Sequence, residues 1–286
     1  ANNDQLAASG FNRLHLIIDR GTALPEESFF KNVVDRVTAV GTAFMGMSVH
    51  CASCHDHKYD PLTQKDFYSL FAFFNNIDAA SETNGGPRNG LQPPTALLAT
   101  PDQEKKRNAI NDQLAKLELE LQAAKKAVQA EKEPQKKTAL TQAVQKLVAR
   151  KKSLEKQRGE LERGMPRAMV MKERTEVRPT FIMKRGRYDD PGEEVTRNTP
   201  EVFPAMKKKG EIASRSDLAE WFIDRRNPLT ARVAVNRFWQ QFFGVGLVKT
   251  SEDLGTQGEL PSHPELLDYL TVSFIESGWD VKALVK

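Results

Sequence analysis

Cys51-Ala52-Ser53-Cys54-His55 is the stretch around which the rest of the chain can be arranged, because it holds both cysteines of the sequence. The two thiols lie three residues apart, and a histidine directly follows the second one. This is the spacing at which two cysteines add to the two vinyl groups of a haem. The histidine then lies under the iron, where a ring nitrogen becomes the proximal axial ligand. The motif therefore predicts a covalently attached haem c, with Cys51 and Cys54 as tethers and His55 as the proximal iron ligand.

Two other chemistries are open to the same residues. With His57, the motif offers two thiolates and two imidazoles to zinc, although four ligands packed into seven residues would strain a tetrahedral site. A redox-active dithiol usually begins a helix that follows a strand, and residues 45–50 (MGMSVH) make a poor strand. A chance match to the haem motif is of order one in ten thousand for this composition. We therefore prefer haem attachment to both alternatives.

The composition describes a polar chain with enough apolar residues for a core. Of its 286 residues 39% are hydrophobic and 28% charged, and the net charge is only +4. No run of about 18 apolar residues is present, so we expect no transmembrane segment. Basic and aromatic residues are not interleaved as in nucleic-acid-binding modules, so we expect no nucleic-acid partner. The chain begins at Ala1 without a methionine, and a covalent haem is assembled outside the cytoplasm, so we expect an exported, periplasmic or cell-surface protein.

Helical spacing flanks the motif on both sides. Upstream, apolar residues recur at helical intervals over residues 25–44. Downstream, Thr63 is expected to cap a strongly aromatic helix over residues 64–75. Its rings either pack as an ordinary core or form the apolar wall of a haem crevice.

A charged, heptad-like segment follows in residues 96–164. Its apolar side chains step by four and three residues, the spacing of an antiparallel coiled-coil hairpin with a break at Pro134. These residues are Ile110, Leu114, Leu117, Leu121, Ala124 and Val128, then Leu140, Val144, Leu147, Leu154 and Leu161. The segment carries no catalytic constellation. It is either a solvated arm or a docking arm for a second subunit or another partner.

The remaining chain is expected to be irregular and then helical. Over residues 165–214 we expect an extended linker with short strands, one of them at 178–186 and ending in a turn, and an acidic, turn-rich loop at 188–195. Helices are expected over residues 215–224, 228–243 and 263–277, the last opened by a capping box at Ser262. The predicted fold class is therefore mainly α: an irregular helical haem-bearing region, a long antiparallel helical hairpin and a C-terminal helical domain.

Several phrases of the sequence match a known group. The chain resembles the planctomycete-type cytochrome proteins, exported proteins in which a domain of unknown function with a Cys-x-x-Cys-His motif precedes a planctomycete-specific domain. The matching phrases are CASCHDHKYDP (51–61), QKDFY (64–68), RGRYD (185–189), PGEEV (191–195), NPLTARV (227–233), VNRFWQ (235–240), GVGLV (244–248) and PSHPELLD (261–268). The resemblance implies that residues 1–95 are the C-terminal part of the haem-bearing domain. It also implies that residues 215–286 begin the planctomycete-specific domain.

The sixth ligand of the iron has several candidates. His15 lies in an Asn-Arg-x-His phrase that resembles one in the same family, and it is the preferred distal ligand. His263 is the weaker distal candidate. The N-terminus of its expected helix favours a neutral ring, which suits a metal ligand, but a capping histidine at the surface is the commoner case. His57 is too close to His55 to reach the opposite haem face, so it is a candidate ligand of a second haem or a propionate contact. Two histidines on the iron would give a lower potential than a histidine and a methionine, for which Met45 and Met47 are the candidates.

Three functions follow from these features. The first is electron transfer through the attached haem to a redox partner protein or a neighbouring haem domain. The second is a haem enzyme, peroxidase-like or oxidising a carbohydrate-type substrate, with an open distal face; no catalytic dyad near the motif supports it, so the sequence leaves enzymatic activity undecided. The third is a structural surface protein with a metal-stapled fold, in which the hairpin forms homo- or hetero-oligomers.

Overall fold

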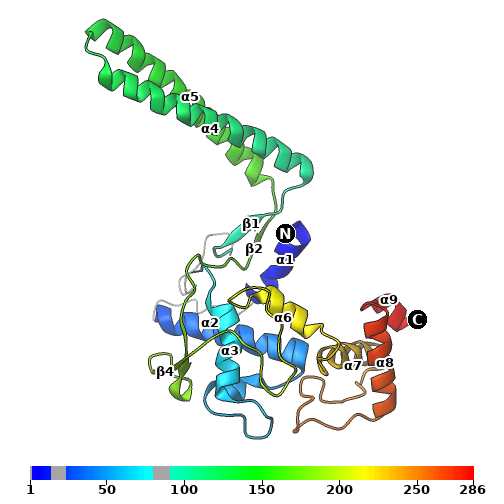
Figure 1. Ribbon diagram of the computed structural model, residues 1–286. Helices are drawn as coiled ribbons and strands as arrows, with labels where there is room; N and C mark the ends of the chain where they lie inside the picture. The colour runs from blue at the N-terminus through cyan, green and yellow to red at the C-terminus, as the bar shows by residue number, and fades with distance from the viewer. Residues whose placement is uncertain (1, 14–23, 80–90) are drawn as a thin grey trace. The chain divides into compact units, whose positions relative to one another are not determined.

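The computed structural model describes residues 2–13, 24–79 and 91–286, and this part of the chain is mainly helical, as predicted (Figure 1). The chain forms two compact units. One contains residues 1–11 and 93–170, and the other contains residues 12–92 and 171–286. The N-terminal helix α1 (Asn3–Ser9) therefore belongs to the same unit as the hairpin, although the two are far apart in the sequence.

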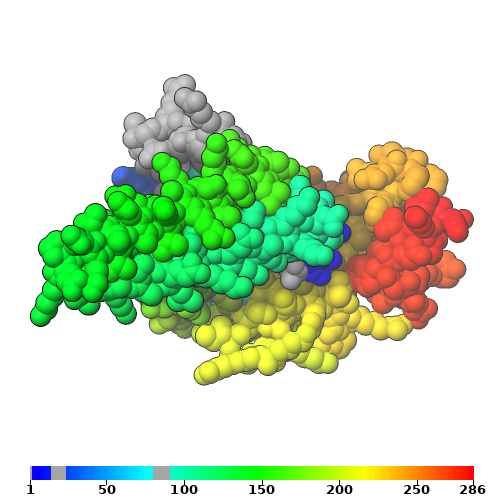
Figure 2. Space-filling view, turned by 90° about the horizontal axis from the view of Figure 1, so that it is seen from above, coloured from blue at the N-terminus to red at the C-terminus, as the bar shows by residue number. Residues whose placement is uncertain are grey.

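The first unit is dominated by the predicted hairpin of α4 (Pro101–Ala130) and α5 (Pro134–Arg163), which run side by side (Figures 1 and 2). Each helix has 30 residues and is about 45 Å long. Each helix begins with a proline, where no backbone N–H is needed, and Pro134 at the start of α5 explains the break between the two helices. Leu117, Leu121 and Leu154 are buried between the arms, so the predicted seam faces inward.

A two-stranded ribbon closes the base of the hairpin. Strand β1 (Thr95–Leu97) pairs antiparallel with β2 (Arg167–Met169), and Ala96 lies opposite Ala168. The side chain of Asn3 in α1 donates to the carbonyl of Ala99 at 2.6 Å. Neither strand has a periodicity long enough to predict its position, although β2 lies in the segment 165–214 that was expected to be an extended linker with short strands.

The second unit carries the cysteine motif. Helix α2 (Pro25–Val40) ends in a π-helical turn, η2 (Gly41–Met45), and a 3₁₀ helix, η3 (Val49–Ser53), follows it. Val49 Cγ2 lies 2.5 Å from the place a Cβ would take on Gly41, so only glycine lets these two segments approach. Helix α3 (Gln64–Asn75) begins at the predicted cap Thr63, whose hydroxyl accepts the N–H of Asp66. Its aromatic side chains are buried in the main core, namely Phe67, Tyr68, Phe71, Phe73 and Phe74.

A second ribbon packs against α3. Strand β3 (Thr180–Met183) pairs antiparallel with β4 (Pro191–Val195), and the turn between them contains the 3₁₀ segment η4 (Lys184–Gly186). The expected strand at 178–186 is confirmed in part, but the loop prediction for residues 191–195 was wrong. Glu193 and Glu194 made this edge strand resemble a loop in the sequence, because only Val195 of the strand is buried.

The C-terminal region is helical, as expected, with α6 (Arg215–Phe222), α7 (Thr230–Phe243), α8 (Pro264–Glu276) and the short α9 (Val281–Val285). The fully buried amide of Asn236 accepts the N–H of Val248 and donates to its carbonyl, which holds the following loop on α7. The predicted capping box at Ser262 does not form. His263 occupies the N-cap without a side-chain bond, because Ser262 Oγ donates to the carbonyl of Leu247 instead. None of the helices described is long and apolar enough to cross a membrane.

Candidate functional site

The 3₁₀ helix η3 and the residue after it have one buried side and one exposed side. Val49, Ala52 and Ser53 are buried in or beside the main core. Cys51 and Cys54 are exposed and form no disulfide. The turn thus presents two free thiols three residues apart, and attachment of a planar group at two points needs such a pair.

Hydrogen bonds to one carbonyl fix the middle of the motif. The carbonyl of Ser53 accepts the phenol of Tyr68 at 2.9 Å and the side-chain amide of Gln64 at 3.2 Å. The same amide nitrogen of Gln64 lies 3.1 Å from the carbonyl of Met183 at the end of β3. Burial, with a smaller contribution from the nearby Cys54, raises the pKa of Tyr68, so the phenol keeps its proton and remains a donor. Side chains of α3 therefore hold the turn by hydrogen bonds, and one of them also connects it to the end of β3.

The ring of His55 is exposed, and its Nδ1 lies 2.7 Å from the carbonyl of Asp56. The tautomer that satisfies this carbonyl carries its proton on Nδ1, which leaves the lone pair of Nε2 free. Histidines that bind metals commonly use one nitrogen in this way and ligate with the other. The carboxylate of Asp56 in turn accepts the N–H of Gln64 at 2.7 Å, at the start of α3. The donor set of the motif therefore fits a c-type haem: two free thiols, then an imidazole with one available nitrogen.

His57 is placed differently. Its side chain is only 3% exposed, and Nδ1 accepts the N–H of Asp60 at 2.8 Å and that of Tyr59 at 3.3 Å. Asp60 Oδ1 accepts the backbone N–H and the hydroxyl of Thr256. These bonds tie the end of the motif to the loop before α8. They leave only Nε2 of His57 for the predicted contact with a second haem or a propionate.

The other predicted ligands are not brought to the motif by any contact of the described residues. His15 lies outside the part of the chain that the structure describes. His263 is exposed, and its ring contacts the neighbouring Ser262 at 3.1 Å. Met45 and Met47 are buried in the main core. Within residues 2–13, 24–79 and 91–286, no group of three or more His, Cys, Asp or Glu side chains could hold a metal ion, so the zinc alternative gains no support there.

Sequence reasoning missed the contact between the motif and the turn after β3. Gly186 has a left-handed φ of 69°, and Cys54 Sγ lies 2.6 Å from the place a Cβ would take on it. The neighbouring Arg185 is also left-handed, with φ 53° and ψ 30°. A turn at the end of the 178–186 segment was expected, but nothing in the sequence indicates which segment that turn contacts.

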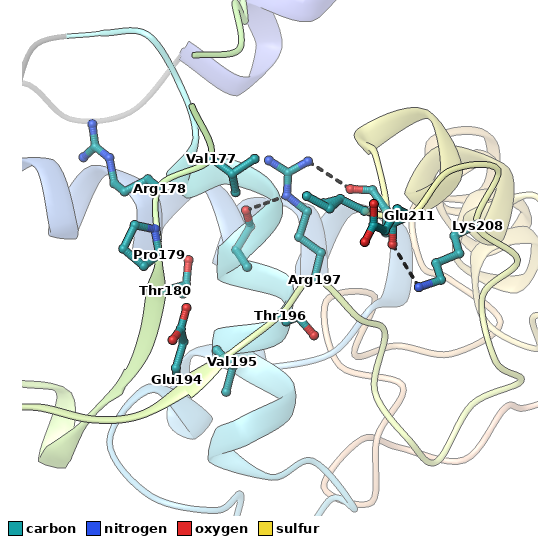
Figure 3. Close-up of a pocket in the computed structure, with 13 residues that line it drawn as sticks. Val177, Arg178, Pro179, Thr180, Glu194, Val195, Thr196, Arg197, Lys208 and Glu211 are labelled. Atoms are coloured by element: carbon teal, nitrogen blue, oxygen red, sulfur yellow. Dashed lines mark hydrogen bonds between the residues drawn. The ribbon is translucent and has the colours of Figure 1, made fainter. Parts of the chain in front are cut away.

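A cavity of about 210 Å³ in the same unit is lined by the ends of β3 and β4 and by residues 196–197 and 211–213 (Figure 3). Arg197 extends along it, and its guanidinium donates to the carbonyls of Ala72 and Ala213. The third nitrogen pairs with Glu173 at 3.3 Å, and Lys208 donates to the carbonyl of Glu211. Because these donors are already used, Arg197 serves to join α3 to the segment before α6.

Two known protein families match the chain, one in its N-terminal part and one in its C-terminal part. Residues 1–79, which include the cysteine motif, match the family PSCyt2, a protein of unknown function (DUF1549). Residues 214–286 match the family PSD1, also a protein of unknown function (DUF1553). No curated protein and no solved structure matches the chain. The two matches support, at the level of the family, its resemblance to the planctomycete-type cytochrome proteins.

Proposed function

We propose that this chain is a c-type haem protein that transfers electrons, with the haem tethered at Cys51 and Cys54 and ligated by His55. One observation carries the proposal. Two exposed, unpaired thiols at this spacing precede a histidine whose Nδ1 is already bonded to a carbonyl. Such covalent attachment takes place outside the cytoplasm, so the proposal includes a periplasmic or cell-surface location.

Each residue of the motif has a defined task in this proposal. The thiol of each cysteine would add across one vinyl group, with the S–H hydrogen transferred to carbon, so that a thioether would form without a net oxidant or reductant. Nε2 of His55 would bind the iron, while the carbonyl of Asp56 keeps the proton on Nδ1 and the ring in its orientation. The bound haem supplies one-electron chemistry. Tyr68 and Gln64 keep the turn rigid, which limits the rearrangement that accompanies electron transfer.

Absorption spectra of the purified native protein, reduced and oxidised, test this function. A reduced α-band of the c type that is unchanged by carbon monoxide is expected for a six-coordinate electron carrier. A c-type band that shifts with carbon monoxide would show an open iron and support the haem enzyme instead. The Cys51→Ala and Cys54→Ala variants are matched controls, since each should lose one tether and retain the fold.

Exposed apolar side chains on the hairpin support an additional role in assembly. Leu119 on α4 is 69% exposed and Val148 on α5 is 45% exposed, although both helices otherwise direct their leucines inward. We propose that this arm contacts a second subunit or another protein. Analytical ultracentrifugation of the native protein and of Leu119→Glu tests the proposal. A mass above the monomer that falls in the variant is expected, and a monomeric native protein would contradict self-association.

A further inference from the structure

Another cavity in the motif-bearing unit is lined by residues of α2, α3 and β3 and of the segments beside β3. Its volume is about 160 Å³. A cavity of about 150 Å³ with an apolar wall is large enough to bind one benzene ring in a protein. Most of the wall is aromatic or apolar, with side chains from Phe29, Phe30, Phe71, Phe181 and Met183. The cavity therefore has the size and the surface for a single ring or a short hydrocarbon chain.

Arg178 contributes a cation without a counter-ion to this wall. Its guanidinium carbon lies 4.1 Å from the centroid of the Phe29 ring, and both residues line the cavity. The side chain is half-buried and forms no ion pair or hydrogen bond with any residue that the structure describes. Burial, with a smaller contribution from the nearby Arg174, lowers the pKa of Arg178 below its ordinary value. A guanidinium that has lost part of its water and has no anion beside it favours the binding of one.

Two hydroxyl groups of the cavity provide further donors. Thr180 Oγ1 accepts a hydrogen bond from Asn75 Nδ2 at 3.0 Å, so the hydrogen of this hydroxyl remains for another acceptor. The phenol of Tyr188 is half-buried and has no hydrogen bond among the described residues. Glu26 also lines the cavity, but it is exposed in the first turn of α2, where water and salt screen its carboxylate. The cavity thus combines apolar walls with donors suited to one anionic group.

We propose that this cavity binds a small carboxylic acid with an apolar body, such as an aromatic acid with one ring, and that Arg178 binds its carboxylate. The planar fork of a guanidinium matches a carboxylate through two parallel hydrogen bonds. The ring of the ligand packs against the phenylalanine side chains, which favour offset or edge-to-face contacts with another ring. A haem or a nucleotide is too large for the cavity, so this site is separate from the cysteine motif and does not depend on the proposed function.

Titration calorimetry of the native protein with three probes tests the site. Benzoate carries the ring and the carboxylate, benzyl alcohol has the ring without the charge, and acetate has the charge without the ring. Benzoate should bind at least about tenfold more tightly than either of the others, because only benzoate uses both the guanidinium and the apolar wall. Equal binding of benzoate and benzyl alcohol would show an apolar cavity without an anion site and overturn the inference, as would a native protein that does not bind benzoate.

Three variants then test the role of Arg178. Arg178→Gln removes the charge and the fork and should weaken benzoate binding about tenfold. Arg178→Lys keeps the charge without the fork and should weaken it less. Arg174→Gln is the matched control, because this charge is near Arg178 but does not line the cavity, and benzoate affinity should stay within about twofold.

Equal benzoate affinities in Arg178→Gln and the native protein, or equal losses in both glutamine variants, would overturn the inference. The midpoint of urea unfolding, measured by tryptophan fluorescence, shows whether each variant is folded under the conditions of the titration. The comparison of the three probes uses only the native protein, so it decides the question even if Arg178→Gln does not fold.

Discussion

The α4–α5 hairpin and the turn that carries Cys51 and Cys54 differ in how their stabilising partners are distributed along the sequence. The hairpin is held by a repeated apolar seam, and each buried leucine has neighbours at heptad spacing. The cysteine turn is held by single contacts that do not repeat. The side chain of Gln64 donates to the carbonyl of Met183, 119 residues away, and Gly186, in the turn that follows Met183, lies against Cys54. Damage to the hairpin should therefore be local and graded, whereas damage to one contact of the turn should disturb the site as a whole.

The three tryptophans, Trp221, Trp239 and Trp279, all lie in the motif-bearing unit. Their fluorescence therefore reports the unfolding of this unit, while far-UV circular dichroism reports both units, including the 60 helical residues of α4 and α5. Unfolding followed by both signals therefore distinguishes damage to the hairpin from damage to the motif-bearing unit.

The largest effect is expected for Gly186→Ala. The new Cβ would collide with Cys54 Sγ at 2.6 Å, and alanine is disfavoured at a φ of 69°. Together these terms should lower the free energy of unfolding by about 4 kcal/mol and shift the fluorescence midpoint in urea. Gly278→Ala is the matched control, since φ is 73° there but no atom lies within 4 Å of the Cβ, and it should cost about 1 kcal/mol. Equal losses in the two variants would show that the contact with Cys54 is unimportant.

Leu121→Ala should weaken the hairpin alone. Leu121 is 4% exposed in the seam, and truncation of a buried leucine costs about 2 to 3 kcal/mol. The loss should appear in the circular dichroism signal, with an unchanged fluorescence midpoint. Lys116→Ala, at an exposed position on the same helix, should change either signal by less than about 0.5 kcal/mol. A fall of the fluorescence midpoint in Leu121→Ala would contradict the independence of the two regions.

Tyr68→Phe should have a smaller effect, centred on the cysteine turn. It removes one donor from the carbonyl of Ser53, which retains the bond from Gln64, so the cost should be about 1 kcal/mol. The exchange of backbone amides in residues 49–55 with deuterium should accelerate, and that of α4 should not. Unchanged exchange in the turn would mean that the phenol does not hold the motif.

The smallest effect is expected in acid. Hydrogen bonds from Arg226 lower the pKa of Asp224 to about 2, from an ordinary value of 3.8. A lowered pKa in the folded state contributes stability above the ordinary value, and this contribution disappears as the pH falls from about 4 to 2. Because the pair lies at the surface, about 0.5 kcal/mol is expected. Asp224→Asn should remove this part of the pH dependence of the fluorescence midpoint, and an identical profile would contradict the assignment.

The parts of the fold that periodicity specifies were predictable. The helical hairpin with its break at Pro134 and the aromatic helix α3 with its cap at Thr63 follow the expected ranges closely. Strand β4 was not predictable, because its exposed Glu193 and Glu194 resemble a loop, and neither was the ribbon of β1 and β2. Short edge strands depend on partners that are distant in the sequence, and no local pattern identifies these partners.

The candidate site likewise contains residues that the sequence predicts and residues that it does not. The spacing of Cys51, Cys54 and His55 predicts attachment chemistry without any knowledge of the fold. The residues that hold the motif are Gln64, Tyr68 and Gly186, and they became recognisable only through their contacts with Ser53 and Cys54. The buried position of His57 was equally hidden, because a histidine two residues from a ligand resembles a ligand in the sequence.

The mass of the denatured native protein, produced in a host that attaches c-type haem, tests the central claim most directly. Thioether bonds survive denaturation, so the mass should exceed that of the polypeptide by one haem. The increase should disappear in the Cys51→Ala, Cys54→Ala double variant. An unmodified mass, in a host that loads a known c-type cytochrome in parallel, would contradict haem attachment at this motif.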